Sequence, residues 1–104
     1  MTYKIAICDD SQADRDYVAS LVRRWASEGD RTAHIEAFSS AEGFLFHYAE
    51  ESDFDILLLD VEMKEMSGIR LAKRLRADGC KAEIAFITSH FEFVTEGYEV
   101  DALH

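Results

Sequence analysis

Three carboxylates and one hydroxyl stand where apolar segments of the sequence end. Asp9 and Asp10 end the first apolar run of the chain, Asp60 ends a central run, and Thr88 ends a later one. If these runs are parallel strands, their carboxyl ends meet at one edge of a sheet and the polar groups converge there. Two carboxylates about 4 Å apart repel each other by roughly 4 kcal/mol at an effective dielectric near 20. A divalent cation with oxygen ligands would offset this repulsion, so the pattern predicts an acidic metal site.

The same residues have a simpler explanation as local structural features. Asp is common at helix caps and in turns, and Thr is favoured in strands. Any one of the four residues could be explained in this way. Polar groups at three matching strand ends are better explained by a shared site.

The segments around these residues alternate between strand and helix patterns. Strand-like runs cover residues 3–8, 32–38, 56–59 and 83–88. The run 56–59 is wholly apolar, as is usual for the buried middle of a parallel sheet. Alternation of this kind predicts an α/β fold with a parallel sheet and right-handed crossovers.

Serines mark the expected starts of the helices. Ser11 is a candidate N-cap for a helix that should end near Gly29. Its apolar residues recur at helical spacing: Tyr17, Val18, Leu21, Val22 and Trp25. Ser39 or Ser40 should cap a second helix and Ser67 a third, and a short fourth helix is expected over 91–98.

Composition excludes several classes of protein. With 104 residues, of which 48% are hydrophobic, the chain is expected to form one small folded domain. No apolar stretch has the roughly 18 residues that a membrane helix needs, and no signal peptide is evident, so a cytoplasmic location is expected. The net charge of −10 argues against direct nucleic-acid binding. His34, His47 and His104 show no metal-ligand spacing and are expected on the surface or in packing contacts.

Taken together, the motifs resemble the receiver domain of two-component response regulators. They are Ile7-Cys8-Asp9-Asp10, Leu59-Asp60-Val61-Glu62-Met63, Met66-Ser67-Gly68 and Phe86-Ile87-Thr88-Ser89. The segment 98–103 is most like receivers attached to LytTR-type DNA-binding domains. The resemblance covers the whole chain. It implies a receiver domain over residues 1–104 with a flavodoxin-like (CheY-like), doubly wound parallel sheet in strand order 2-1-3-4.

The resemblance also implies a role for each residue of the acidic site. Asp60 matches the aspartate that accepts a phosphoryl group from a histidine kinase. Asp10 matches a direct Mg²⁺ ligand, Asp9 an acid that reaches the metal through water, and Glu62 a ligand through its backbone carbonyl. Thr88 matches the hydroxyl that contacts the transferred phosphoryl group. Such a domain is a phosphoacceptor that assists its own phosphorylation, and it switches an attached DNA-binding output domain.

The chain departs from the family pattern after the fourth strand. Receivers normally continue into a fifth strand that carries a lysine and then into a fifth helix, whereas this sequence ends at His104 with no Lys after Thr88. We therefore expect an incomplete receiver whose fourth strand forms an open sheet edge. Open edges invite pairing with another chain, so we expect self-association and a rearranged segment over 91–104.

Two other functions compete with the phosphorylation switch. The first is a receiver-like interaction module that signals by docking, without phosphorylation. The second is a hydrolase of the haloacid dehalogenase type, which needs an aspartate two residues after its nucleophile, where this chain has Glu62. Mg²⁺ binding near the three aspartates would favour the switch over the docking module.

Overall fold

Strands and helices alternate along residues 1–87, which are the residues that this computed structural model describes. The elements are β1 Thr2–Cys8, α1 Gln12–Glu28, β2 Thr32–Phe38, α2 Ala41–Tyr48, β3 Ile56–Asp60, α3 Gly68–Ala77 and β4 Glu83–Ile87. All four strands and the first three helices therefore fall where the sequence predicts them. The helix predicted over 91–98 lies outside the described residues. Within residues 1–87, no helix has the length and apolar character needed to cross a membrane.

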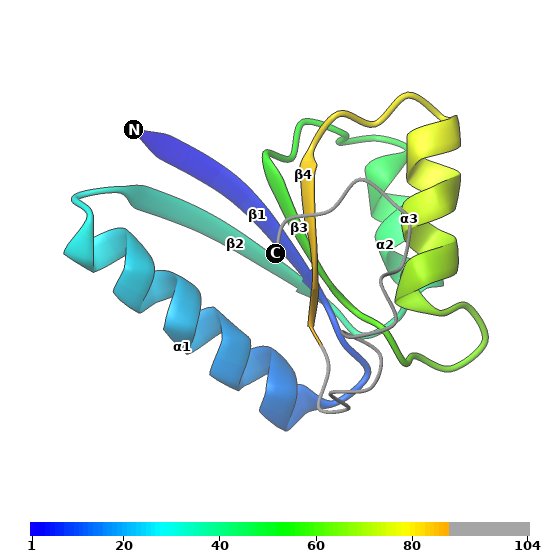
Figure 1. The fold of residues 1–104 in the computed structure, drawn as a ribbon, viewed down its shortest axis with the longest axis horizontal. Coiled ribbons are helices and arrows are strands. Elements are labelled where there is room, and N and C mark those ends of the chain that lie inside the picture. The colour runs from blue at the N-terminus through cyan, green and yellow to red at the C-terminus, as the bar shows by residue number, and fades with distance from the viewer. Residues whose placement is uncertain (88–104) are drawn as a thin grey trace.

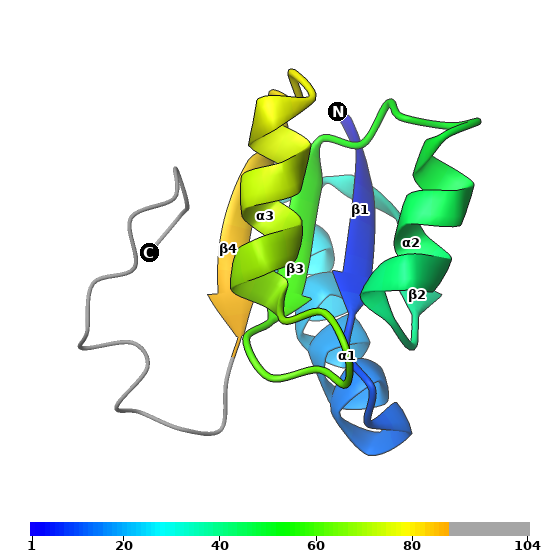
Figure 2. The same ribbon diagram turned by 90° about the vertical axis from the view of Figure 1, so that its right-hand side faces the viewer.

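The four strands form one parallel sheet in the order β2-β1-β3-β4, which confirms the predicted order. Helix α1 covers one face of the sheet, and α2 and α3 cover the other (Figures 1 and 2). Strand β1 lies between β2 and β3, with Cys8 in register with Phe38 on one side and Leu59 on the other. This register places the residues that follow β1 beside the last residue of β3.

Alternate residues of the central strands fill the two cores. Ile5 and Ile7 of β1 pack against α1, whereas Ala6 and Cys8 face α2 and α3. On β3, Leu57 and Leu59 enter the larger core on the α2 and α3 side; both are fully buried. Burial on both faces explains why these strands read as continuous apolar runs in the sequence.

Serine N-caps start each of the three helices described within residues 1–87. The hydroxyls of Ser11, Ser40 and Ser67 accept hydrogen bonds from the backbone N–H groups three residues on, at 3.3, 2.9 and 3.2 Å. This confirms Ser11 and Ser67 as caps and selects Ser40 over Ser39. Because serines cap the helices that follow β1 and β3, the aspartates at those strand ends are not needed for capping.

The apolar surface of α1 is wider than its contact with the sheet. Val18, Val22 and two alanines of α1 are buried, whereas Tyr17, Leu21 and Trp25 are 64, 42 and 37% exposed. The exposed residues form a row one position away from the buried row, which rotates them by about 100° around the helix. Helical spacing in the sequence could not separate these two rows, since both recur every four residues.

Strand β4 lies at an edge of the sheet and, among the described strands, pairs only with β3. The expected open edge stays a prediction, because residues 88–104 lie outside the described part of the chain. The predicted rearrangement of 91–104 falls outside the described residues, and self-association stays a prediction.

Candidate functional site

The carboxylates of Asp9, Asp10 and Asp60 converge at the carboxyl edge of the sheet. Each offers an oxygen that lies within 4.8 Å of the other two. Asp9 is only 4% exposed, Asp60 is partly buried, and Asp10 is open to solvent. Adjacent parallel strands bring them together, because β1 and β3 pair directly and end side by side. The convergence predicted from the sequence is therefore confirmed for these three residues.

The same local turn orients the carboxylates at both strand ends. Asp9 Oδ1 accepts a hydrogen bond from the backbone N–H of Ser11 at 2.9 Å. Asp60 Oδ1 accepts one from the backbone N–H of Glu62 at 3.3 Å. In each case the side chain bonds the backbone two residues on, which is the Asx turn favoured by aspartate. The turn role and the site role are thus performed by the same residues.

Arg15 supports the first of these turns and was not singled out by the sequence. Its guanidinium donates a hydrogen bond of 2.7 Å to the backbone carbonyl of Asp9. This bond joins the first turn of α1 to the end of β1, and it brings a positive charge close to the acidic cluster. The sequence does carry a signal for this contact. Long side chains on a helix point back toward its N-terminus, and Arg15 lies four residues after the cap Ser11.

Gly68 allows the start of α3 to lie directly on the end of β3. Its backbone N–H donates to the carbonyl of Val61 at 3.1 Å. A Cβ atom at this position would clash with the backbone carbonyl of Asp60. The φ angle of Gly68 is not positive, so the position does not require glycine for an unusual backbone conformation. Glycine is required here because the two backbones approach each other closely. The sequence pointed to Gly68 only as part of a motif, without this reason.

Burial and mutual repulsion make ionisation of the acidic cluster unfavourable. Burial is the largest cause that raises the pKa of Asp60, to about 7, followed by the negative charge of Asp9 and then smaller effects of Asp10 and Asp14. The hydrogen bond from Glu62 acts in the opposite direction. The pKa of Asp9 is also raised by burial, and the bond from Ser11 and the charge of Arg15 partly offset this rise. The site therefore favours a bound cation.

The carboxylates lie at the end of a large cavity. Its volume is about 820 Å³, and it runs from Asp9, Asp10 and Asp60 along the exposed row of α1. A smaller hollow of about 510 Å³ approaches Asp10 and Glu62 from the other side, beside the loop before α3. The site is therefore open to an ion and to a larger phosphorylated group.

The residues fit a magnesium ion by their chemistry. Mg²⁺ takes one or two protein carboxylates, keeps several waters and accepts phosphate oxygens. A deeply buried acid beside an exposed one provides ligands and leaves room for water. Two predicted partners stay predictions: the carbonyl of Glu62, and Thr88, which lies outside the described residues. The last described residue of β4, Ile87, is in register with Asp60.

Asp60→Asn should stabilise the metal-free protein at high pH. The pKa of Asp60 is about 7 in the folded chain, and that of an unfolded aspartate is about 3.9. The carboxyl of Asp60 therefore contributes its full stability below about pH 4, and this contribution is lost as the pH rises through 7. An amide does not ionise. After a discount for partial exposure, the gain at pH 8 should be about 1–3 kcal/mol, and it should largely vanish at pH 4. Urea unfolding with a chelator at both pH values measures it. An equal gain at the two pH values would contradict the raised pKa.

Known proteins resemble this chain over nearly its whole length. A sequence model described as the response regulator receiver domain matches residues 5–103. Accessory gene regulator protein A of Staphylococcus epidermidis is 26% identical over 96% of this chain, and sensory transduction protein LytT of Bacillus subtilis is 31% identical over 96%. The chain spans 44% and 39% of the lengths of these two proteins.

The fold agrees with solved structures of response regulators. The structure of TrrA from Thermotoga maritima, solved in complex with Mg²⁺-BeF, superposes with a TM-score of 0.79 at 20% identity, over 96% of this chain and 81% of that one. This likeness shows a common fold. The family model and the relatives confirm the resemblance found in the sequence, including its similarity to the LytTR-type regulators. The chain belongs to the response regulator receiver domain family.

Proposed function

We propose that Asp60 accepts a phosphoryl group from a histidine kinase and that Mg²⁺ bound at the acidic cluster is required for the transfer. The observation that carries this proposal is the convergence of Asp9, Asp10 and Asp60 within 4.8 Å at the ends of two paired strands. Membership of the receiver family agrees with it. So does the relative TrrA, whose structure is described as a complex with Mg²⁺-BeF.

Each residue of the cluster has a distinct part in the proposed transfer. An ionised Asp60 oxygen attacks phosphorus, while the bond between phosphorus and the donor histidine nitrogen breaks. Glu62 N–H, bonded to Asp60 Oδ1, holds the carboxylate so that its other oxygen is the nucleophile. Asp10, the exposed acid, would hold the metal directly, and Asp9 would hold it through water. The backbone carbonyl of Glu62 would add a ligand.

The bound metal would supply positive charge where it is most needed. When bound, Mg²⁺ would neutralise charge on the transferring oxygens and lower the repulsion among the acids. Its charge also favours the ionised form of Asp60, whose pKa in the bare site is about 7. After the transfer, the hydroxyl of Thr88 contacts the phosphoryl group. Thr88 follows directly on β4, the strand paired with β3.

We further propose that this domain switches a DNA-binding output domain in a longer regulator. The chain spans less than half of the relatives, and their names describe a gene regulator and a sensory transduction protein. Its own net charge of −10 makes it a poor ligand for nucleic acid, so the proposed DNA contact belongs to the output domain.

Incubation with Mg²⁺ and a small acyl phosphate tests the central proposal. Intact mass measurement should show the addition of one phosphoryl group, and the addition should disappear when a chelator removes the metal. Absence of any mass change, together with Mg²⁺-induced NMR shifts confined to the three aspartates, would show a metal site without phosphoacceptor chemistry. Absence of both would favour the docking module.

Asp10→Ala should weaken Mg²⁺ binding more than Asp9→Ala does. The first change removes a direct ligand, and the second removes a ligand that acts through water. We expect a loss of about tenfold or more for Asp10→Ala. Both variants should stay folded, because removing one acid relieves repulsion. Calorimetric titration with Mg²⁺ gives the two affinities, and a larger loss for Asp9→Ala would reverse the assigned roles.

A further inference from the structure

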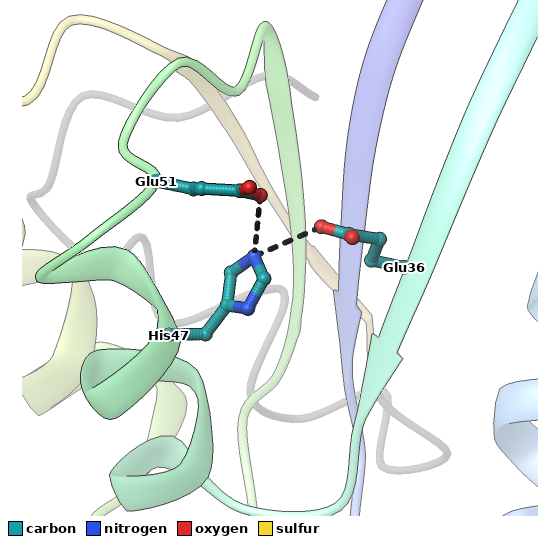
Figure 3. A group of neighbouring side chains, drawn as sticks. All are labelled: Glu36, His47 and Glu51. Atoms are coloured by element: carbon teal, nitrogen blue, oxygen red, sulfur yellow. Dashed lines mark ion pairs between the residues drawn. The ribbon is translucent and has the colours of Figure 1, made fainter.

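A second cluster of metal-ligand side chains shares no residue with the three aspartates. Glu36 comes from β2, His47 from α2, and Glu51 from the segment after α2 (Figure 3). His47 Nε2 lies 3.1 Å from Glu36 Oε2 and 3.2 Å from Glu51 Oε2. The two oxygens and the nitrogen lie within 4.8 Å of one another. One nitrogen thus faces two carboxylates at once.

Hydrogen bonding alone does not explain this arrangement. An imidazole nitrogen carries either one proton or one lone pair, so His47 Nε2 can bond only one of the two carboxylates. Among the described residues, neither His47 Nε2 nor Glu36 Oε2 has a hydrogen bond of good geometry, although both atoms are shielded from solvent; their contact at 3.1 Å is an ion pair only when the ring is protonated. Buried polar atoms in proteins are nearly always paired. A cation between the three ligand atoms would pair His47 Nε2 and Glu36 Oε2 while the imidazole stays neutral.

The distances suit a small transition-metal ion. Zn²⁺ binds imidazole nitrogen and carboxylate oxygen at about 2.0–2.2 Å, which puts tetrahedral ligands about 3.4 Å apart. The separations of 3.1 and 3.2 Å from Nε2 are close to this value. Three protein ligands leave a fourth position for water. Mg²⁺ and Ca²⁺ prefer oxygen ligands alone, so the nitrogen of His47 favours a transition metal.

Packing holds His47 in place for this role. Its ring lies against Phe38 and Phe54, with centroid distances of 5.2 and 5.9 Å. Ligands fixed by their surroundings bind metal more tightly than mobile ones. The side chain of Glu51 is 55% exposed, compared with 30% for His47 and 27% for Glu36. An ion can therefore reach the site when the Glu51 side chain swings aside.

Lys4 competes with a metal for one of the three ligands. Its ammonium lies 3.4 Å from Glu51 Oε2 and 2.8 Å from Asp53 Oδ1. The shorter contact to Asp53 can persist while Glu51 binds an ion. A positive charge so close to the site nevertheless lowers its affinity for a cation. Replacing Lys4 should therefore raise the affinity of the cluster for a cation, whereas replacing one of the three ligands should lower it.

We propose that Glu36, His47 and Glu51 bind a divalent transition-metal ion, with Zn²⁺ as the best match. The ion joins β2 to the carboxyl end of α2, and it is independent of the Mg²⁺ at the strand ends. This proposal does not rest on phosphorylation of Asp60.

Calorimetric titration with Zn²⁺ tests the proposal in a chain that carries Asp10→Asn and Asp60→Asn, so that the first cluster is disabled. We expect one equivalent to bind. His47→Gln should lower the affinity at least about tenfold, since loss of even an outer-shell partner costs a metal site about that much. Glu50→Gln is the matched control for Glu51→Gln, because Glu50 is a neighbouring exposed carboxylate outside the cluster. Lys4→Met should raise the affinity several-fold.

NMR of the histidine rings separates a lost ligand from a lost fold. In the unmodified chain, Zn²⁺ should shift the ring signals of His47 more than those of His34, whose Nε2 lies 4.0 Å from the other oxygen of Glu36. Zinc binding that survives His47→Gln in a folded variant would overturn the proposal. So would complete loss of zinc binding on disabling the aspartates, or a fall in affinity with Lys4→Met.

Discussion

Asp60→Asn should abolish phosphorylation by a small acyl phosphate or by a histidine kinase. An amide lacks the anionic oxygen that attacks phosphorus, while its size and shape keep the end of β3 in place. Asp60 is the last residue of β3, and the backbone N–H of Glu62 orients its carboxylate. We expect no detectable phosphoryl addition by intact mass measurement under conditions that fully label the unmodified chain.

Asp16→Asn is a matched control for this experiment. Asp16 is an exposed aspartate of α1 that lies outside the cluster, so the same change of charge should leave labelling intact. Labelling of Asp60→Asn at the level of the control would show that another residue accepts the phosphoryl group. If the two variants are equally stable without metal at low pH, the loss of labelling comes from the missing carboxylate and not from unfolding.

Gly68→Ala should destabilise the fold by about 2–3 kcal/mol, as overpacking against rigid neighbours does. The added methyl group would clash with the carbonyl of Asp60 and approach its carbonyl carbon to 2.9 Å. Both are backbone atoms, so either α3 or the end of β3 must move. Denaturant unfolding measures the loss. We also expect Mg²⁺ affinity to fall in the variant that remains folded, because Asp60 is a part of that backbone.

Gly43→Ala is the matched change on α2. Its nearest neighbour would be the hydroxyl of Ser40 at 3.1 Å, which is a side chain that can shift slightly. The gain in helix propensity, up to about 1 kcal/mol, partly offsets that crowding. A loss at Gly43 as large as the loss at Gly68 would show that the close approach to Asp60 is not the cause.

The elements and the acidic cluster were predictable because local patterns determine them. Apolar runs bounded by polar residues specify the strands, and serines before helical patterns specify the caps. Once the strands are parallel and β3 lies beside β1, Asp9, Asp10 and Asp60 come together, since the carboxyl ends of parallel strands share an edge. Predicting this acidic cluster did not require knowing how side chains of distant elements pack.

The features that escaped prediction depend on distant contacts. The exposed row of α1, which includes Tyr17 and Trp25, follows the same spacing as the buried row, so the sequence does not say which row packs. The reason for Gly68 lies in the backbone of another element. His47 meets Glu36 only because β2 and α2 pack together, and their separation in the sequence gives no metal spacing.

The order of the strands has a consequence for how this chain folds. Asp10 and Asp60 are fifty positions apart, and they meet only when β3 docks on β1, with α1, β2 and α2 lying between them in the sequence. A β1-α1-β2 unit, with its two parallel strands, therefore carries only the Asp9 and Asp10 half of the acidic cluster. An ion that bridges both halves selects molecules in which β3 has docked. A bound ion would then slow the escape of this strand, and so protect the chain from local opening and proteolysis.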